Sequence, residues 1–214
     1  MKKIIYPLQL EYISSFEKQE NALIKKIERF ARENKVPILS KDSSKFLEQL
    51  IISLRPQKVL EIGTAIAYSA IKISRNLSAS GKLYTIEKSN DSIRIANKFI
   101  NEAKLKNKIN LLEGDAQKIM PKLKVKFDFI FLDADKEDYK KLFELSLTLL
   151  KKGGVIFIDN LLWHGFAASK KVPKKYISST KHIRSFNKIF MKTTSLNTSI
   201  LPIGDGIGLG IKIK

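Results

Sequence analysis

The sequence predicts an α/β fold in which seven strands form a mostly parallel sheet with helices on both faces. One indication is that short apolar runs alternate along the chain with longer amphipathic segments. A second is that polar residues bound these apolar runs, as they do in strands buried on both faces. A third is Gly204-Asp205-Gly206 between the last two runs, a tight-turn signal that predicts an antiparallel pair at one edge of the sheet.

The expected elements divide a single domain, residues 1–214, into a helical region over 1–55 and a Rossmann-like core over 56–214. In the helical region we expect one or two helices within 8–35, and another over Ser43–Leu54 with Ser43 or Asp42 as its N-cap. In the core, helices near 67–77, 90–105, 115–122, 137–150 and 180–193 are expected to follow or separate strands at Lys58–Ile62, Lys82–Glu87, Ile109–Glu113, Phe127–Asp133, Val155–Asp159, Thr198–Pro202 and Ile207–Lys212.

The chain is strongly basic, with 40 Lys and Arg residues against 21 Asp and Glu residues and a formal net charge of +19. Such an excess favours a polyanionic partner. The alternative is compositional drift, because 34 of the basic residues are Lys. Residues 160–204, the basic stretch, contain no acidic residue, and drift alone would not clear acids from one stretch. We therefore favour a binding surface there, with Tyr176, Phe186 and Phe190 interleaved among Lys170, Lys171, Lys174, Lys175, Lys181, Arg184, Lys188 and Lys192.

Other classes of protein are disfavoured by what the sequence lacks. It has no cysteine, which excludes disulfides, thiolate metal sites and Cys nucleophiles. The first residues contain no apolar core of signal-peptide length, because Pro7 and Glu11 interrupt them. No apolar run approaches the length of a membrane span. We therefore expect a cytoplasmic protein without membrane contact.

Three polar side chains follow the ends of two predicted strands. Asp133 closes FDFIFLD, and Asp159 and Asn160 end GGVIFIDN. Residues 136–150 are long enough for one crossover helix, so the two strands should be parallel neighbours whose carboxyl ends open into the same cleft. Two carboxylates and an amide oxygen suit a hard divalent cation such as Mg²⁺. The alternative is that Asp133 caps a strand end and that Asp159-Asn160 is a turn pair.

The first strand leads into a loop suited to a cationic ligand. Gly63 lets the backbone approach a ligand closely, whereas Glu61, two residues earlier, disfavours a diphosphate. S-adenosylmethionine carries an ammonium and a sulfonium and no phosphate. Glu87 ends the second strand, where an acid can accept both ribose hydroxyls, and Asp115 after the third strand could receive an adenine amino group or cap the next helix. For the Gly63 loop an ordinary strand–helix turn is the alternative.

Several segments form a specific combination: LEIGTAIAYSAI, TIEKS, EGDA, FIFLDADKEDY, GGVIFIDNLLWHG and LPIGDGIGL. Together they resemble the cation-dependent O-methyltransferases, the family that contains catechol and caffeoyl-CoA O-methyltransferases, from Val36 to the C-terminus. The resemblance implies Mg²⁺ at Asp133, Asp159 and Asn160. It also implies S-adenosylmethionine contacts at Glu61, Gly63, Tyr68, Ser69, Glu87, Asp115, Ala116 and Asp133. One departure is Ala67, where the family usually has Gly.

The resemblance also implies catalytic roles for Asp133 and for Lys136, which lies three residues beyond it. A divalent cation nearby would disfavour the ammonium form of Lys136, so its neutral amine could act as general base. The alternative is one more exposed lysine. Trp163 and His164 could border a substrate base or pack the loop against the sheet. Asp205 is not included among the catalytic candidates, because hairpin chemistry alone explains an Asp between two glycines.

Within the family, the chain looks most similar to the branch that methylates 5-hydroxyuridine in bacterial tRNA. The function we expect is therefore the S-adenosylmethionine- and Mg²⁺-dependent conversion of wobble 5-hydroxyuridine in tRNA to 5-methoxyuridine. The first alternative is methylation of catechols or catechol-bearing CoA esters, and another is a non-catalytic nucleic-acid-binding module. A homodimer is expected because the family commonly dimerises.

Overall fold

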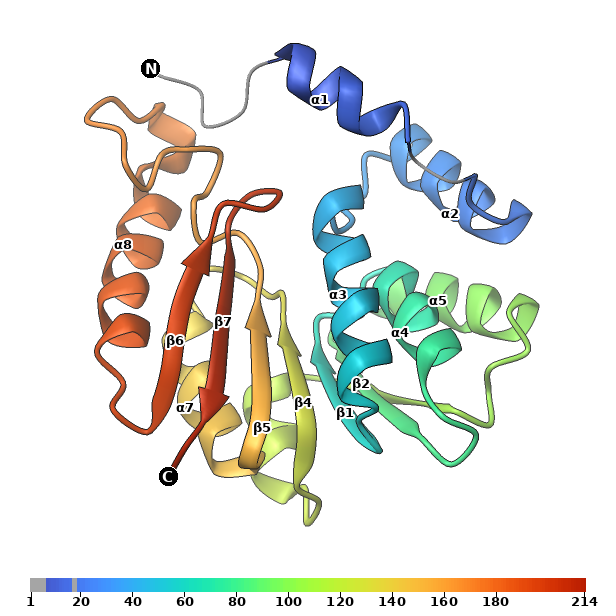
Figure 1. Ribbon diagram of the computed structural model, residues 1–214. Helices are drawn as coiled ribbons and strands as arrows, with labels where there is room; N and C mark the ends of the chain where they lie inside the picture. Colours follow the sequence, from blue (N-terminus) through green and yellow to red (C-terminus); the bar gives the residue numbers. More distant parts are fainter. Residues whose placement is uncertain (1–6, 17–18) are drawn as a thin grey trace.

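A computed structural model describes residues 7–16 and 19–214, and its strands form one sheet in the order β3-β2-β1-β4-β5-β7-β6 (Figure 1). The first five strands in the chain pair in parallel, and β7 runs antiparallel to both β5 and β6. The predicted sheet is thereby confirmed, with strands β1 (Lys58–Ile62), β2 (Lys82–Glu87), β3 (Ile109–Glu113), β4 (Phe127–Leu132), β5 (Leu150–Ile158), β6 (Leu196–Leu201) and β7 (Ile207–Lys212).

Helices cover both faces of this sheet, as predicted (Figure 1). None of the described helices is long and apolar enough to cross a membrane. In chain order the helices are α1 (Pro7–Ser14), α2 (Ala22–Glu33), α3 (Lys41–Leu54), α4 (Tyr68–Asn76), α5 (Asn90–Glu102), α6 (Ala116–Ile119), α7 (Tyr139–Leu149) and α8 (Ile177–Met191).

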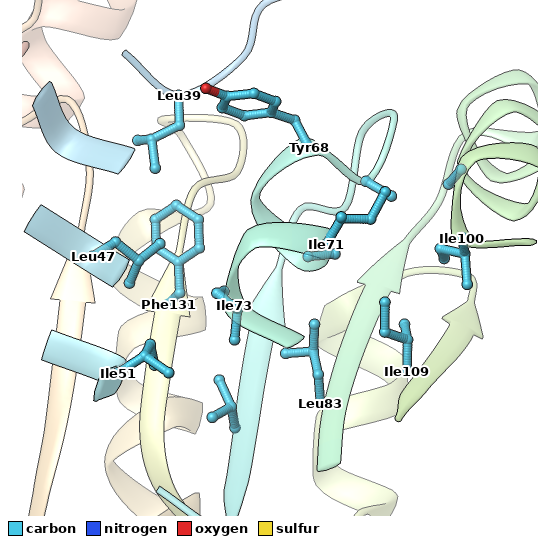
Figure 2. Close-up of a cluster of buried hydrophobic side chains, with 14 of the residues drawn as sticks. Leu39, Leu47, Ile51, Tyr68, Ile71, Ile73, Leu83, Ile100, Ile109 and Phe131 are labelled. Carbon is cyan, nitrogen blue, oxygen red and sulfur yellow. The ribbon is translucent and has the colours of Figure 1, made fainter. Parts of the chain in front are cut away.

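Alternating residues of the central strands feed two apolar cores. Phe129 and Phe131 of β4 face α2, α3, α4 and α5, and Figure 2 shows Phe131 beside Leu47 of α3. Ile130 and Leu132 of the same strand face α7 and α8. Burial of β4 on both faces explains its apolar run from Phe129 to Leu132. It also leaves the ends of the strands as the place where polar side chains can gather.

Some element boundaries differ from the predicted ones. Helix α3 begins at Lys41, because the Oγ of Ser40 accepts a hydrogen bond from the Ser43 amide at 3.2 Å, so the predicted caps Ser43 and Asp42 are wrong. Strand β5 begins at Leu150 rather than Val155, and β6 begins at Leu196 rather than Thr198. The acids at the ends of β4 and β5 lie one residue beyond the last paired position.

Candidate active site

A cavity of about 700 Å³ opens where the parallel strands end. Each of the strands β1 to β5, or the loop after it, contributes to its wall, which is the consequence expected from strands that run in the same direction. The cavity brings together eight of the residues predicted from the sequence, namely Gly63, Glu87, Asp115, Ala116, Asp133, Lys136, Asp159 and Asn160.

The loop after β1 approaches the end of β4 closely. Gly63 has φ +101°, and a Cβ built on it would overlap the carbonyl oxygen of Asp133. Only glycine accommodates both the left-handed backbone and this contact. Ala67 is also left-handed, at φ +66°, and is fully buried at the start of α4. The Gly that the family resemblance implies at this place would avoid the cost of about 1–2 kcal/mol that an L-residue incurs there.

The carboxylate of Glu87 joins this loop to the end of β2. One oxygen accepts the Ala65 amide at 2.9 Å, and the other accepts the amides of Lys88 and Ser89. Asp115 accepts the Gln117 amide at 2.8 Å and so caps α6, which confirms the capping interpretation. Both carboxylates are therefore held in place on the cavity wall, where they could accept hydrogen bonds from hydroxyl or amino groups of a ligand.

Glu61, Tyr68 and Ser69 are not among the residues that line the cavity. The Tyr68 hydroxyl donates to Glu28 at 3.0 Å, which ties α4 to α2. Glu61 is fully buried and accepts a hydrogen bond from Thr85 Oγ1 at 2.5 Å, while its Oε1 has no partner among the described residues. Burial raises the pKa of Glu61 to about 7, and hydrogen bonds from Ser69 and Thr85 only partly oppose this shift. Contact of these three residues with the cofactor stays a prediction.

The raised pKa of Glu61 predicts a pH dependence of stability. In the unfolded chain this carboxyl titrates near its ordinary value of about 4.3, so between there and about 7 the folded state binds more protons. The contribution of Glu61 to the free energy of unfolding therefore falls as the pH rises through this window. Glu61→Gln should flatten the dependence measured by urea unfolding of the ligand-free protein at pH 5 and pH 7.5. An equal fall in both proteins would contradict the assignment.

The residues predicted to hold a metal converge at the ends of β4 and β5. Asp159 is buried, and its Oδ1 has no partner among the described residues. Burial raises the pKa of Asp159 to about 7, and the nearby charge of Asp133 adds to the shift. The Nζ of Lys136 lies 2.7 Å from Asn160 Oδ1 and 3.3 Å from Asp133 Oδ1. The amino group of Lys136 thus already lies against oxygens of the predicted set.

These observations fit a hard divalent cation. The set supplies two carboxylates and one amide oxygen, ligands that Mg²⁺ accepts in proteins, and a cation would neutralise the mutual repulsion of Asp133 and Asp159. It would also give the buried Asp159 Oδ1 a partner. No cluster of three or more His, Cys, Asp or Glu side chains suited to a metal occurs in the described part of the chain, so the amide of Asn160 is essential to this assignment.

Tyr139, the first residue of α7, belongs to the site although our sequence reasoning did not single it out. Its buried hydroxyl accepts a hydrogen bond from Lys136 Nζ at 2.7 Å and donates one to the carbonyl of Asp159 at 3.0 Å. Burial raises its pKa well above the ordinary value, so the hydroxyl stays protonated. Tyr139 therefore holds the amine of Lys136 at the end of β5. The sequence feature that could have identified Tyr139 is its position three residues after Lys136, at the start of a predicted helix.

Four rings form an aromatic rim at the mouth of the cavity: Trp163, His164, Phe166 and Tyr176. The ring centroids of Phe166 and His164 lie 5.1 and 5.4 Å from that of Tyr176. Trp163 and His164 line the cavity, and Trp163 Nε1 also donates to Ser179 Oγ at 2.9 Å. Both residues border the cavity, and Trp163 also packs the loop, whereas contact of either residue with a substrate base stays a prediction.

The chain matches the O-methyltransferase family model over residues 13–213. It is 32% identical over 176 residues to the caffeoyl-CoA O-methyltransferase of Populus kitakamiensis, and the matched segment covers 78% of this chain and 75% of the relative. A candidate caffeoyl-CoA O-methyltransferase from Staphylococcus aureus has a similar structure, with a TM-score of 0.89, 30% identity, and 96% and 99% of the two chains covered. TomG of Streptomyces achromogenes, solved with S-adenosylmethionine, gives a TM-score of 0.84 at 26% identity over 95% of each chain.

Proposed function

This chain belongs to the O-methyltransferase family and is an S-adenosylmethionine-dependent O-methyltransferase of the caffeoyl-CoA type, and we propose that its substrate is tRNA. The proposed reaction is methylation of wobble 5-hydroxyuridine to 5-methoxyuridine. The observation that carries the proposal is the basic stretch, which begins at Asn160 in the candidate metal site and continues through the aromatic rim into α8.

All eight basic side chains of this stretch are exposed, so they are accessible to a polyanion. Lys181 and Lys188 lie on α8, and Lys192 is its C-cap residue. Lys174 and Lys175 lie beside Tyr176 of the rim. Contacts between such basic side chains and phosphates dominate the affinity of proteins for nucleic acid. Arg184 has a different role, because its guanidinium donates to the carbonyls of Phe166, Ala167 and Ser169, the last at short distance, and so holds the loop in place.

The interleaved aromatic residues divide into two groups. Tyr176 lies in the aromatic rim, where rings can stack on a base. Phe186 and Phe190 are buried and pack against Phe143 of α7. Our expectation that all three aromatics serve the binding surface is therefore wrong for Phe186 and Phe190, since they lie on the face of α8 that packs into the core.

The chemistry of the site suits a ring with two adjacent oxygens. In 5-hydroxyuracil the 5-hydroxyl and O4 are neighbours, as the two hydroxyls of a catechol are. A bound Mg²⁺ would favour the deprotonated form of the acceptor hydroxyl. In the proposed site the Nζ of Lys136 receives the hydroxyl proton, Tyr139 holds that amine in place, and the aromatic rim orients the ring and excludes water.

A small-molecule O-methyltransferase is the second candidate, since relatives carry the name caffeoyl-CoA O-methyltransferase. CoA is itself anionic, so the positive charge suits a catechol-bearing CoA ester too. Binding strength as a function of salt separates the candidates. About six to eight phosphate contacts would give a log–log slope of roughly −5 to −7, which a small substrate would not approach.

The direct test is transfer of label from S-adenosylmethionine to tRNA carrying 5-hydroxyuridine, with a catechol and CoA-ester panel in parallel. We expect labelled 5-methoxyuridine, and a marked loss of tRNA methylation in Lys174→Ala/Lys175→Ala. The matched control is Lys151→Ala/Lys152→Ala, which removes an adjacent lysine pair at the end of β5 that lies away from the cavity. Label that enters only the small molecules would overturn the tRNA proposal and make the charge mainly compositional.

We also propose a homodimer in which a second copy covers the apolar side chains exposed at the N-terminal end, namely Leu8, Tyr12, Ile13 and Phe16. Their exposure on one short helix and the residues after it leaves an apolar surface that is costly in water. Sedimentation equilibrium should give about twice the chain mass of 24.4 kDa. A monomer at micromolar concentration would contradict this.

A further inference from the structure

The turn between β6 and β7 is wedged between two other parts of the site. Gly204 has φ +56°, and a Cβ there would overlap the hydroxyls of Ser40 and Ser43 at the start of α3. Gly206 has φ +88°, and a Cβ there would overlap Leu162 in the loop after β5. Close contact on both sides therefore requires both glycines, and it fixes the position of Asp205 between them.

Asp205 holds the loop after β5 through its backbone and its side chain. Its carbonyl accepts the Leu162 amide at 2.9 Å, and the Gly206 carbonyl accepts the Leu161 amide at 2.8 Å. The carboxylate Oδ1 accepts the His164 amide at 2.6 Å, and Oδ2 accepts Asn160 Nδ2 at 3.3 Å. This loop contains left-handed non-glycine residues at Asn160, Trp163 and His164, so it is a strained segment that these bonds restrain.

The contact with Asn160 determines which end of its amide faces the metal site. A side-chain amide can be rotated so that its oxygen and its NH₂ exchange places, but an ionised carboxylate only accepts hydrogen bonds. Beside Asp205, the NH₂ of Asn160 must therefore face the carboxylate. The amide oxygen then faces inward, where it lies 2.7 Å from Lys136 Nζ.

We propose that Asp205 is a positioning residue that orients the Asn160 amide so that its oxygen is presented to a divalent cation. The inference rests on the metal-binding part of the proposed function and is independent of whether the substrate is tRNA or a small molecule. The rotated amide would direct its NH₂ toward the cation and its oxygen toward Asp205. Both contacts would be unfavourable, so the carboxylate excludes this orientation.

The test is the affinity for Mg²⁺, measured by calorimetry in the presence of S-adenosylhomocysteine. In Asp205→Asn the introduced amide can pair with either the oxygen or the NH₂ of Asn160, so one orientation of the Asn160 amide is no longer selected. We expect about 10–100-fold weaker Mg²⁺ binding, the usual effect of removing such a supporting contact. The affinity for S-adenosylhomocysteine and the thermal midpoint of the metal-free protein should change little. Turnover should recover as Mg²⁺ is raised.

Two further variants separate orientation from charge. Asp135→Asn removes the same charge from the cavity wall, where Asp135 pairs with Lys88 at 2.6 Å, and it should weaken Mg²⁺ binding by less than about threefold. Asn160→Asp/Asp205→Asn exchanges the two side chains and should restore most of the affinity, because a carboxylate presents oxygen in either orientation. Equal Mg²⁺ affinity of Asp205→Asn and wild type, or equal losses in Asp205→Asn and Asp135→Asn, would overturn the proposal. So would a loss of stability without a change in Mg²⁺ affinity.

Discussion

Gly63→Ala should abolish cofactor binding and lower the free energy of unfolding by about 3 kcal/mol or more. The variant combines a left-handed backbone with a methyl group that overlaps the carbonyl of Asp133, so β1 and β4 cannot keep their spacing at the cavity. Urea unfolding gives the stability, and calorimetry with S-adenosylhomocysteine gives the affinity.

Gly153→Ala is the matched control for this variant. Gly153 is also left-handed, at φ +76°, but a Cβ there meets nothing within 4 Å. It should therefore cost only about 1–2 kcal/mol of backbone strain and leave cofactor binding intact. If the two variants lost equal stability and both bound S-adenosylhomocysteine normally, the close approach of Gly63 to Asp133 would have no role in forming the site.

Lys136→Met should lower kcat by about a hundredfold to ten-thousandfold while S-adenosylhomocysteine still binds. The Nζ of Lys136 is buried between Asn160, Asp133 and the Tyr139 hydroxyl, where a proton acceptor is required, and methionine retains most of the side-chain volume. Lys88→Met is the control, because Lys88 also lines the cavity but pairs with Asp135 at the exposed rim. A kcat for Lys136→Met within a few-fold of that for Lys88→Met would contradict the role of general base.

Much of the fold and much of the site follow from local sequence patterns. Continuous apolar runs identified the buried strands, and parallel direction then placed the residues after each strand at one edge. The convergence of Asp133, Asp159 and Asn160 is therefore a consequence of topology that one sequence already contains. The motifs identified the O-methyltransferase family, and the family match confirms it.

Other features depend on contacts between distant segments. Asp205 meets Asn160 across 45 positions, and a Gly-Asp-Gly turn has the same local pattern whether or not its carboxylate points at a site. The burial of Phe186 likewise depends on where α8 packs, which spacing among lysines does not reveal. Ser40 was missed as a cap because Asp42 and Ser43, two and three residues later, carry side chains that cap helices equally well. Tertiary packing decides the surroundings of Asp205 and Phe186, whereas the cap depends on a local choice among neighbouring residues that the sequence leaves open.

The central claim is that Asp133, Asp159 and Asn160 hold a divalent cation beside the cofactor cavity. Anomalous diffraction from crystals grown with Mn²⁺ and S-adenosylhomocysteine tests it most directly. We expect one strong peak within coordination distance of a carboxylate oxygen of Asp133, Asp159 Oδ1 and Asn160 Oδ1, with Lys136 Nζ displaced from Asn160. No peak at these oxygens despite bound S-adenosylhomocysteine, or a peak held by other residues, would contradict the claim.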